Sequence, residues 1–255
     1  GKLRMILLPL WNALCFFVNY ANIDKWTIEK SKEPESLLDR WILASLQRLK
    51  RGTSEHMDAY DLQRSIGPLV EFIEDLTNWY IRRSRRRFWK AENDADKLCA
   101  YSTLCKVLKE LSMAVAPFVP FLAEKMYQTL RQEGDPESVH LCDYPQAEKK
   151  YENDGLDRLM KRAIETAGMA RSLRVKHKIK IRQPLPALIL VTRDKEEQEG
   201  LKQVEEILKE ELNVKEIRYT AGEEELVHLS AKANFKTLGP RLGPLYCPIL
   251  GVFRI

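Results

Sequence analysis

Hydrophobic residues recur three and four positions apart through the first half of the chain, which is the spacing of one face of an α-helix. This pattern predicts helices from residue 3 to about 21–24, from 37 to about 50, over 59–90 and 94–116, and a shorter helix that contains 122–130. Because consecutive amphipathic helices with short connections bury their apolar faces against one another, an antiparallel bundle is predicted.

Glycine and proline mark two weak points in these helices. Arg51-Gly52 is expected to weaken the second helix, and Gly67-Pro68 is expected to kink the third helix near its start. Proline removes one backbone hydrogen bond and clashes with the preceding turn, so a bend is its usual consequence.

The pattern changes after Gly134-Asp135-Pro136. Residues 139–146 are predicted to be extended, and a helix follows over 153–175. Strands are then predicted at 187–192, 214–220 and 225–231, with a helix over 196–212 between the first two. The expected fold is mainly α: an antiparallel helix bundle followed by a small α/β junction module. The expected domains are a bundle over 1–134, a linker over 135–150 and a module over 151–255.

The distribution of charged residues along the chain is more informative than the net charge. The chain has 255 residues and a net charge of only +5. Residues 82–90 nevertheless carry six cations and no acid, residues 171–182 also carry six cations and no acid, and acidic residues collect over 196–211. Segregated charge of this kind indicates docking surfaces rather than general solubility.

The most informative segment is 78–90, Asn-Trp-Tyr-Ile-Arg-Arg-Ser-Arg-Arg-Arg-Phe-Trp-Lys. Guanidinium groups bind phosphate and stack on bases, and aromatic rings offer stacking platforms for unpaired bases. A solvated basic helix end is the alternative, but such surfaces seldom carry two tryptophans. At 100° per residue, one broad helix face holds the candidates for contact with single-stranded or looped RNA: Trp79, Arg82, Arg83, Arg86, Trp89 and Lys90.

Arg87 lies instead on the line of apolar residues that faces the core. A cation that faces a core must be paired, so we expect a buried ion pair with a carboxylate of the bundle, either Asp39 or Asp75.

Two further basic segments are candidates. Between residues 176 and 182 cations alternate with His177, Ile179 and Ile181, so an extended chain would place the cations on one side. Such a ribbon suits a phosphate backbone, and equally suits a charged edge strand that discourages sheet association. The Gly-Pro loop of 234–243 could present two more cations, although most such loops are only turns. The candidates are Lys176, Lys178, Lys180 and Arg182 in the first segment and Lys236 and Arg241 in the second.

Several function classes are disfavoured by the sequence. The five cysteines include no Cys-x-x-Cys pair and the four histidines are scattered, so no metal site is predicted and free thiols in a reducing cytoplasm are expected. Residues 5–18 are apolar but short of a membrane span and interrupted by Pro9 and Asn12, so a buried helix is expected there. No phosphate-binding loop, serine elbow or His-Glu-x-x-His motif occurs, and no catalytic residue is predicted.

Several motifs resemble a known family. Asp39-Arg-Trp-Ile42, Tyr60-Asp-Leu62, the segment from Asn78 to Trp89 and Ala116-Pro-Phe118 resemble the helical anticodon-binding domain of class I synthetases for branched aliphatic amino acids. Ile179-Lys-Ile-Arg-Gln-Pro-Leu185 and the segment from Asn234 to Gly243 are similar to the isoleucyl-tRNA synthetases within that class. The resemblance covers nearly the whole chain.

The resemblance implies a tRNA-binding part of an ATP-dependent ligase that joins isoleucine to its tRNA. The family's catalytic part uses ATP and Mg²⁺ and carries motifs like His-Ile-Gly-His and Lys-Met-Ser-Lys-Ser, which are missing here. The expected chain is therefore a C-terminal fragment that is inactive alone and has no cofactor of its own. Its expected partners are an isoleucine-accepting tRNA and the missing catalytic domain, and no membrane.

The expected mechanism is that the bundle grips the anticodon stem-loop. Arginines 82, 83 and 86 would position the phosphates and the two tryptophans would stack on splayed bases, while residues 176–182 would track adjacent phosphates. A protein-docking module, in which the basic helix face binds an acidic partner, is the alternative.

Overall fold

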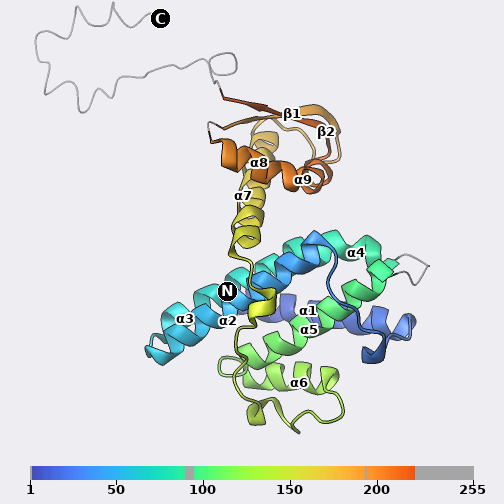
Figure 1. Cartoon of the computed structure of the whole chain (residues 1–255), viewed down its shortest axis with the longest axis vertical. Helices are drawn as coiled ribbons and strands as arrows, with labels where there is room; N and C mark the ends of the chain where they lie inside the picture. Colours follow the sequence, from blue (N-terminus) through green and yellow to red (C-terminus); the bar gives the residue numbers. More distant parts are fainter. Residues whose placement is uncertain (1, 90–94, 193, 222–255) are drawn as a thin grey trace, which may run out of the picture. The chain divides into compact units, whose positions relative to one another are not determined.

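The computed structural model describes residues 2–89, 95–192 and 194–221 (Figure 1). The chain divides between Ile164 and Glu165 into two compact units, and each is described by itself. The domain bounds expected at 134 and 150 stay a prediction.

The first unit is a helical bundle. Helix α2 packs against α3 and α5, α5 packs against α6, and α1 contacts α3 and α5. The mainly α fold is therefore confirmed. The helices are α1 (Lys2–Ile23), α2 (Leu37–Asp58), α3 (Leu62–Glu74), α4 (Arg82–Trp89), α5 (Ala95–Val115) and α6 (Pro120–Leu130).

Large apolar side chains from these helices fill the bundle core. Trp41 of α2, Phe72 of α3 and Leu104 of α5 are all almost completely buried. Removing such side chains from water stabilises the fold by about 1.5–3 kcal/mol each. The core of the first unit accounts for the helical periodicity of its sequence.

Residues 6–23 of α1 have the length and mean hydropathy of a membrane span, the one such segment among the residues that the structure describes. Core helices pass the same test, so one helix is little ground for a membrane assignment. Leu10, Leu14 and Phe17 are buried. One side of α1 therefore forms part of the bundle core.

Capping side chains fix the ends of α2 and α3. Ser36 Oγ accepts a hydrogen bond from Asp39 N at 3.0 Å, and Asp61 Oδ1 accepts one from Arg64 N at 3.1 Å. The weak point expected at Gly52 is not a break, because α2 continues to Asp58. One interior glycine costs about 1 kcal/mol, which packing against α3 and α5 offsets.

The helix predicted over 59–90 contains a departure from α geometry that was not expected, while the kink expected at Gly67-Pro68 stays a prediction. Pro68 lies inside α3, whereas a π-helix spans Asp75–Ile81 between α3 and α4. A π-helix bonds i to i+5 and so shifts the facing of everything that follows. The direction in which the side chains of α4 point therefore cannot be predicted by counting 100° per residue from α3.

The buried side chain of Lys50 attaches the segment after α6 to the bundle. This segment forms 3₁₀ turns at Val139–Leu141 and Lys149–Tyr151, so the extended run predicted over 139–146 is wrong at its start. Lys50 is 2% exposed, pairs with Glu110 and donates to Gln146 O at 3.1 Å. An almost fully buried ammonium needs these partners, so its position fixes the path of the chain beside α2.

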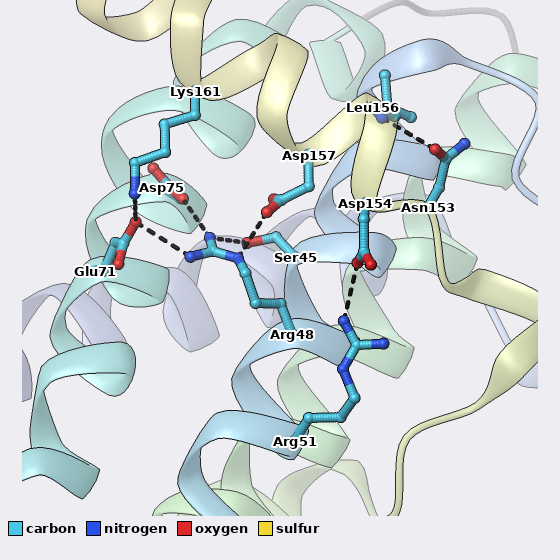
Figure 2. Close-up of polar contacts among 10 residues, drawn as sticks. All are labelled: Ser45, Arg48, Arg51, Glu71, Asp75, Asn153, Asp154, Leu156, Asp157 and Lys161. Carbon is cyan, nitrogen blue, oxygen red and sulfur yellow. Dashed lines mark hydrogen bonds and ion pairs between the residues drawn. The ribbon is translucent and has the colours of Figure 1, made fainter.

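Arg48 of α2 joins the first turns of α7 (Asp154–Lys176) to the bundle (Figure 2). Its guanidinium lies 2.6 Å from Asp157, 3.2 Å from Glu71 and 3.8 Å from Asp75. Lys161 Nζ lies 2.9 Å from Glu71. Two cations thus face three carboxylates, and burial raises the pKa of Asp75 to about 7 despite the charge of Arg48.

The second unit contains the rest of α7 and a small α/β module. Strands β1 (Leu185–Val191) and β2 (Val214–Thr220) are parallel, with Leu185 opposite Val214 and Val191 opposite Thr220. These two predicted strands are confirmed. The predicted helix between them is two helices, α8 (Lys195–Gln203) and α9 (Glu205–Leu212), and the strand predicted over 225–231 lies outside the described residues.

Candidate nucleic-acid interface

The π-helix places Trp79 in the interior. Its side chain is only 3% exposed, and the guanidinium carbons of Arg82 and Arg83 lie 5.9 and 5.7 Å from the centroid of its ring. The prediction that Trp79 lies on the same exposed helix face as the arginines is therefore wrong. The reason is the change of helical facing across residues 75–81, which the apolar spacing does not reveal.

Helix α4 turns one face inward through Ser84 and Phe88, which are both buried. The Phe88 ring packs edge-on against Tyr101 at 4.9 Å and Phe16 at 5.1 Å between centroids. Residues on the opposite side of the helix from these two anchors face away from the core. The outward stripe has the spacing i, i+3, i+4, i+7 and consists of Arg82, Arg85, Arg86 and Trp89, all exposed.

This outward stripe differs from the predicted face by the loss of Trp79, the gain of Arg85 and a smaller exposure of Arg83. Arg85 belongs to it and was missed, because its place depends on the facing set by the π-helix. Arg83 is only half-buried and leans on Trp79. The inward position of Phe88, an aromatic four residues after a small Ser84, was the available sequence signal.

Hydrogen bonds orient two members of the stripe. Arg82 Nε donates to Asn78 O at 2.7 Å, and Trp89 Nε1 donates to the Tyr20 hydroxyl. Trp89 nevertheless stays 58% exposed. An indole that is held at its nitrogen while its ring remains open to solvent is suited to stacking.

Arg87 anchors α4 to the bundle, as predicted. Its two terminal nitrogens each lie 2.7 Å from the carboxylate of Asp39, which is completely buried, and it also pairs with Asp96 at 2.8 Å. The Tyr80 hydroxyl donates to the same carboxylate at 2.7 Å. Burial works to lower the pKa of Arg87, but the bonds from Asp39 outweigh it and raise that pKa. The predicted pairing with Asp39 is confirmed.

The ribbon predicted over 176–182 is wrong, because these residues form a helix end and a turn. Lys178 adopts the left-handed conformation, with φ of 55°. Lys178 N donates to Val175 O at 3.0 Å and Ile179 N donates to Arg174 O at 2.8 Å, the two bonds of a Schellman motif. Ile181 is 44% exposed and so does not face a core.

Arg174 holds this turn from within. It is 6% exposed, and its Nη1 donates to the carbonyls of Lys180 at 3.0 Å and Gln183 at 2.9 Å. Its Nη2 donates to Leu212 O at 2.6 Å. The guanidinium thereby closes the turn onto the end of α9 and leaves four cations exposed around it: Lys176, Lys178, Lys180 and Arg182.

The candidates thus fall into two groups. The α4 stripe lies in the first unit and the four cations of the 176–182 turn lie in the second. The remaining candidates, Lys90, Lys236 and Arg241, lie outside the described residues.

Within the part of the chain that the structure describes, we find no evident site for a metal ion or for a nucleophile. No group of three or more His, Cys, Asp or Glu side chains there could hold a metal ion. Cys15, Cys99, Cys105 and Cys142 are free thiols, and burial raises the pKa of Cys105 to about 11. That thiol is therefore protonated at neutral pH and a poor nucleophile.

Comparison with known proteins identifies similarity over most of the chain. Residues 39–189 match the family described as the anticodon-binding domain of tRNA ligase. The chain is 46% identical over 257 residues to an isoleucine–tRNA ligase of Treponema denticola, which covers 95% of the chain. It is 48% identical over 242 residues to that of Chlamydia trachomatis serovar D and 45% identical over 244 residues to that of Protochlamydia amoebophila. The chain spans only 23–24% of the length of these relatives.

Proposed function

Because the protein belongs to the family of anticodon-binding domains of tRNA ligases, we propose that it binds the anticodon stem-loop of an isoleucine-accepting tRNA. The observation that carries this proposal is the outward stripe of α4. Three guanidinium groups and one open indole ring share a helix face whose segment contains no acid. Phosphate contacts and base stacking are the two interactions that looped RNA requires.

The guanidinium groups of the stripe bind phosphates and the ring of Trp89 stacks on an unpaired base. Bidentate hydrogen bonds make arginine a better phosphate ligand than lysine in such a position. Arg87 has a different role, since its bonds to Asp39 hold α4 with this face outward. It is a positioning residue.

The 176–182 turn supplies a second phosphate contact. Its four exposed cations surround a backbone that Arg174 has already ordered, so little entropy is lost when a phosphate binds. Phosphate contacts give affinity but no base identity. Choice among anticodons therefore depends on base-edge contacts made elsewhere.

We propose the whole protein's activity only at the level of the family. A longer protein would attach isoleucine to tRNA in the cytoplasm with ATP and Mg²⁺. The chain contains neither His-Ile-Gly-His nor Lys-Met-Ser-Lys-Ser, and its described residues offer no cluster of metal ligands. No step of ATP chemistry is assigned to these residues.

The direct experiment is a binding titration of the chain with three ligands: isoleucine tRNA, a tRNA for another amino acid, and polyglutamate. The proposal predicts tighter binding of isoleucine tRNA than of the other two. Equal or tighter binding of polyglutamate would instead favour the alternative of a docking surface for an acidic protein. Lys125→Gln, an exposed cation of α6, serves as the matched control for loss of one charge.

A further inference from the structure

A cavity of about 430 Å³ lies in the first unit, and its lining includes no residue of the α4 stripe. Its walls come from the loop after α1, from α2, from α5, and from the chain after α6. Ligand sites in proteins have volumes of about 300–1,000 Å³, so one small ring system with a substituent fits. The lining residues used below are Ile28, Lys32, Leu43, Thr103, Met113 and Gln132.

The polar groups of the cavity leave one positive charge uncompensated. Lys106 pairs with Glu110 and Glu148, and Lys109 pairs with Asp135. Glu33, which also lines the cavity, pairs with Lys150 at 2.8 Å. No ion pair to Lys32 occurs among the described residues, although its backbone N donates to Ser102 Oγ at 2.9 Å. The cavity is therefore suited to a ligand with a single negative charge.

Thr103 provides a second, independent indication of a ligand. Its side chain is 3% exposed, lines the cavity, and its Oγ1 has no hydrogen-bond partner among the described residues. A buried hydroxyl without a partner costs about 1–3 kcal/mol, which a bound donor or acceptor would relieve. Gln132 lines the same cavity, and its side-chain amide forms no bond recorded within the described ranges.

Three apolar side chains form another part of the lining. Leu43 is 1% exposed, and Ile28 and Met113 flank the same space. Walls of this kind, with a few convergent polar groups, suit a flat ring whose edge carries donors and acceptors. A simple inorganic anion would leave these apolar surfaces without contacts.

We propose that this cavity binds one unstacked nucleotide of an RNA loop. The base enters between Ile28, Leu43 and Met113, with Thr103 and Gln132 at its edge and Lys32 at its phosphodiester. A phosphodiester carries one negative charge, which matches the single uncompensated ammonium, whereas a nucleoside triphosphate would need more cations. This inference rests on the proposed function and adds to it a site where base identity is read.

The test uses two variants that should leave the fold intact. Thr103→Val replaces the hydroxyl by a methyl group of the same shape, and removing an unpartnered hydroxyl does not destabilise a fold. Lys32→Gln removes the exposed charge at the rim. Each is expected to weaken binding of isoleucine tRNA by about 3- to 10-fold, with Lys125→Gln as the unaffected control.

A second measurement separates this inference from the proposed function. Methyl NMR of methionine-labelled protein is recorded with the four homodinucleoside monophosphates at millimolar concentration. We expect the Met113 resonance to shift and that of the completely buried Met126 to stay. If tRNA binds but Met113 does not respond and both variants bind tRNA like wild type, the cavity is not a nucleotide site and the proposed function stands. If tRNA does not bind at all, the proposed function itself fails.

Discussion

Trp79 and Trp89 show how two residues of the same type in one segment take opposite roles. Trp79 is 3% exposed and packs inside the bundle, whereas Trp89 is 58% exposed at the end of α4. Both belong to the aromatic and basic segment 78–90, whose composition does not distinguish them. The difference follows from their positions before and after the end of the π-helix at Ile81.

Replacing each tryptophan should therefore affect a different property. Trp89→Ala should weaken tRNA binding by about 1–3 kcal/mol, because a stacked base loses its platform. It should leave the free energy of unfolding almost unchanged. Trp79→Ala should lower that free energy by about 3–5 kcal/mol, because it opens a cavity in the core.

These two outcomes are checked by urea unfolding and by tRNA titration of the same samples. Unchanged tRNA affinity in Trp89→Ala would remove the indole from the binding surface. A fully stable Trp79→Ala variant would contradict the burial of that side chain.

Arg87 was predictable from sequence, because a cation on an apolar stripe requires a buried partner. Arg87→Met leaves the buried Asp39 carboxylate with only the Tyr80 hydroxyl as a partner among the described residues, so we expect a loss of about 3–5 kcal/mol in the free energy of unfolding. Arg86→Met, an exposed neighbour in the same helix, is the matched control and should cost far less. Chemical unfolding of both variants is the measurement, and equal losses would show that the pair with Asp39 is unimportant.

Asp75 makes stability depend on pH. Burial raises its folded-state pKa to about 7 from a usual value near 3.8, so the folded state binds the proton more tightly than the unfolded state. Stability should consequently fall as pH rises from about 4 to about 7. Asp75→Asn removes this contribution, so its free energy of unfolding relative to wild type should rise by about 4 kcal/mol across the same interval, since one pKa unit corresponds to about 1.4 kcal/mol.

The check is a series of urea unfolding curves at several pH values for wild type and Asp75→Asn. Asp135 and Glu148 have pKa values below their usual range, and they add the opposite slope in acid. Because the comparison between the two proteins cancels those contributions, parallel curves between pH 4 and 7 would contradict the raised pKa of Asp75.

At the scale of elements, the helices of the bundle were predicted in the right places, although α2 continues past its predicted end to Asp58 and the helix predicted over 59–90 is divided by a π-helix. Their apolar stripes extend over many turns, and the burial of residues such as Leu104 and Leu108 enforces the same period. The π-helix was missed, since one changed turn alters facing without breaking the apolar pattern. Its effect on the candidate site was large, because α4 follows it directly.

In the 176–182 turn, the sequence pattern predicted a regular extended segment that the structure does not contain. The alternation of cations with isoleucines has the period of a strand, yet α7 ends there in a Schellman motif. The carbonyl bonds of the buried Arg174 favour the turn, and they involve Leu212, far along the chain. Sequence periodicity carries no information about such a contact.

A substitution at Lys178 can separate the effect of backbone strain on stability from the effect of charge on RNA binding. A lysine in the left-handed conformation is less stable there than glycine, so Lys178→Gly should keep or raise stability, by at most about 1 kcal/mol. It should also weaken tRNA binding, because one phosphate contact is lost. A stable variant with undiminished affinity at low salt would argue that the turn does not contact RNA.

At the scale of the whole molecule, charge segregation is the property that links sequence to function. A net charge of +5 would steer an anion only modestly, but the exposed cations of α4 and of the 176–182 turn are concentrated in two short segments. This much was predictable from the sequence. The cavity beside Thr103, where we propose that a base binds, was not predictable, because it is assembled from four separate parts of the chain.

The most direct test of the central claim is the salt dependence of isoleucine tRNA binding to wild type and to the triple variant Arg82→Gln/Arg85→Gln/Arg86→Gln. If about five phosphates are neutralised, log affinity should fall against log salt with a slope of about −3 to −4 for wild type. The triple variant should have a slope shallower by about 2, since each lost contact removes roughly 0.7. The same slope for both proteins would contradict the claim that the outward face of α4 binds the phosphates of the RNA.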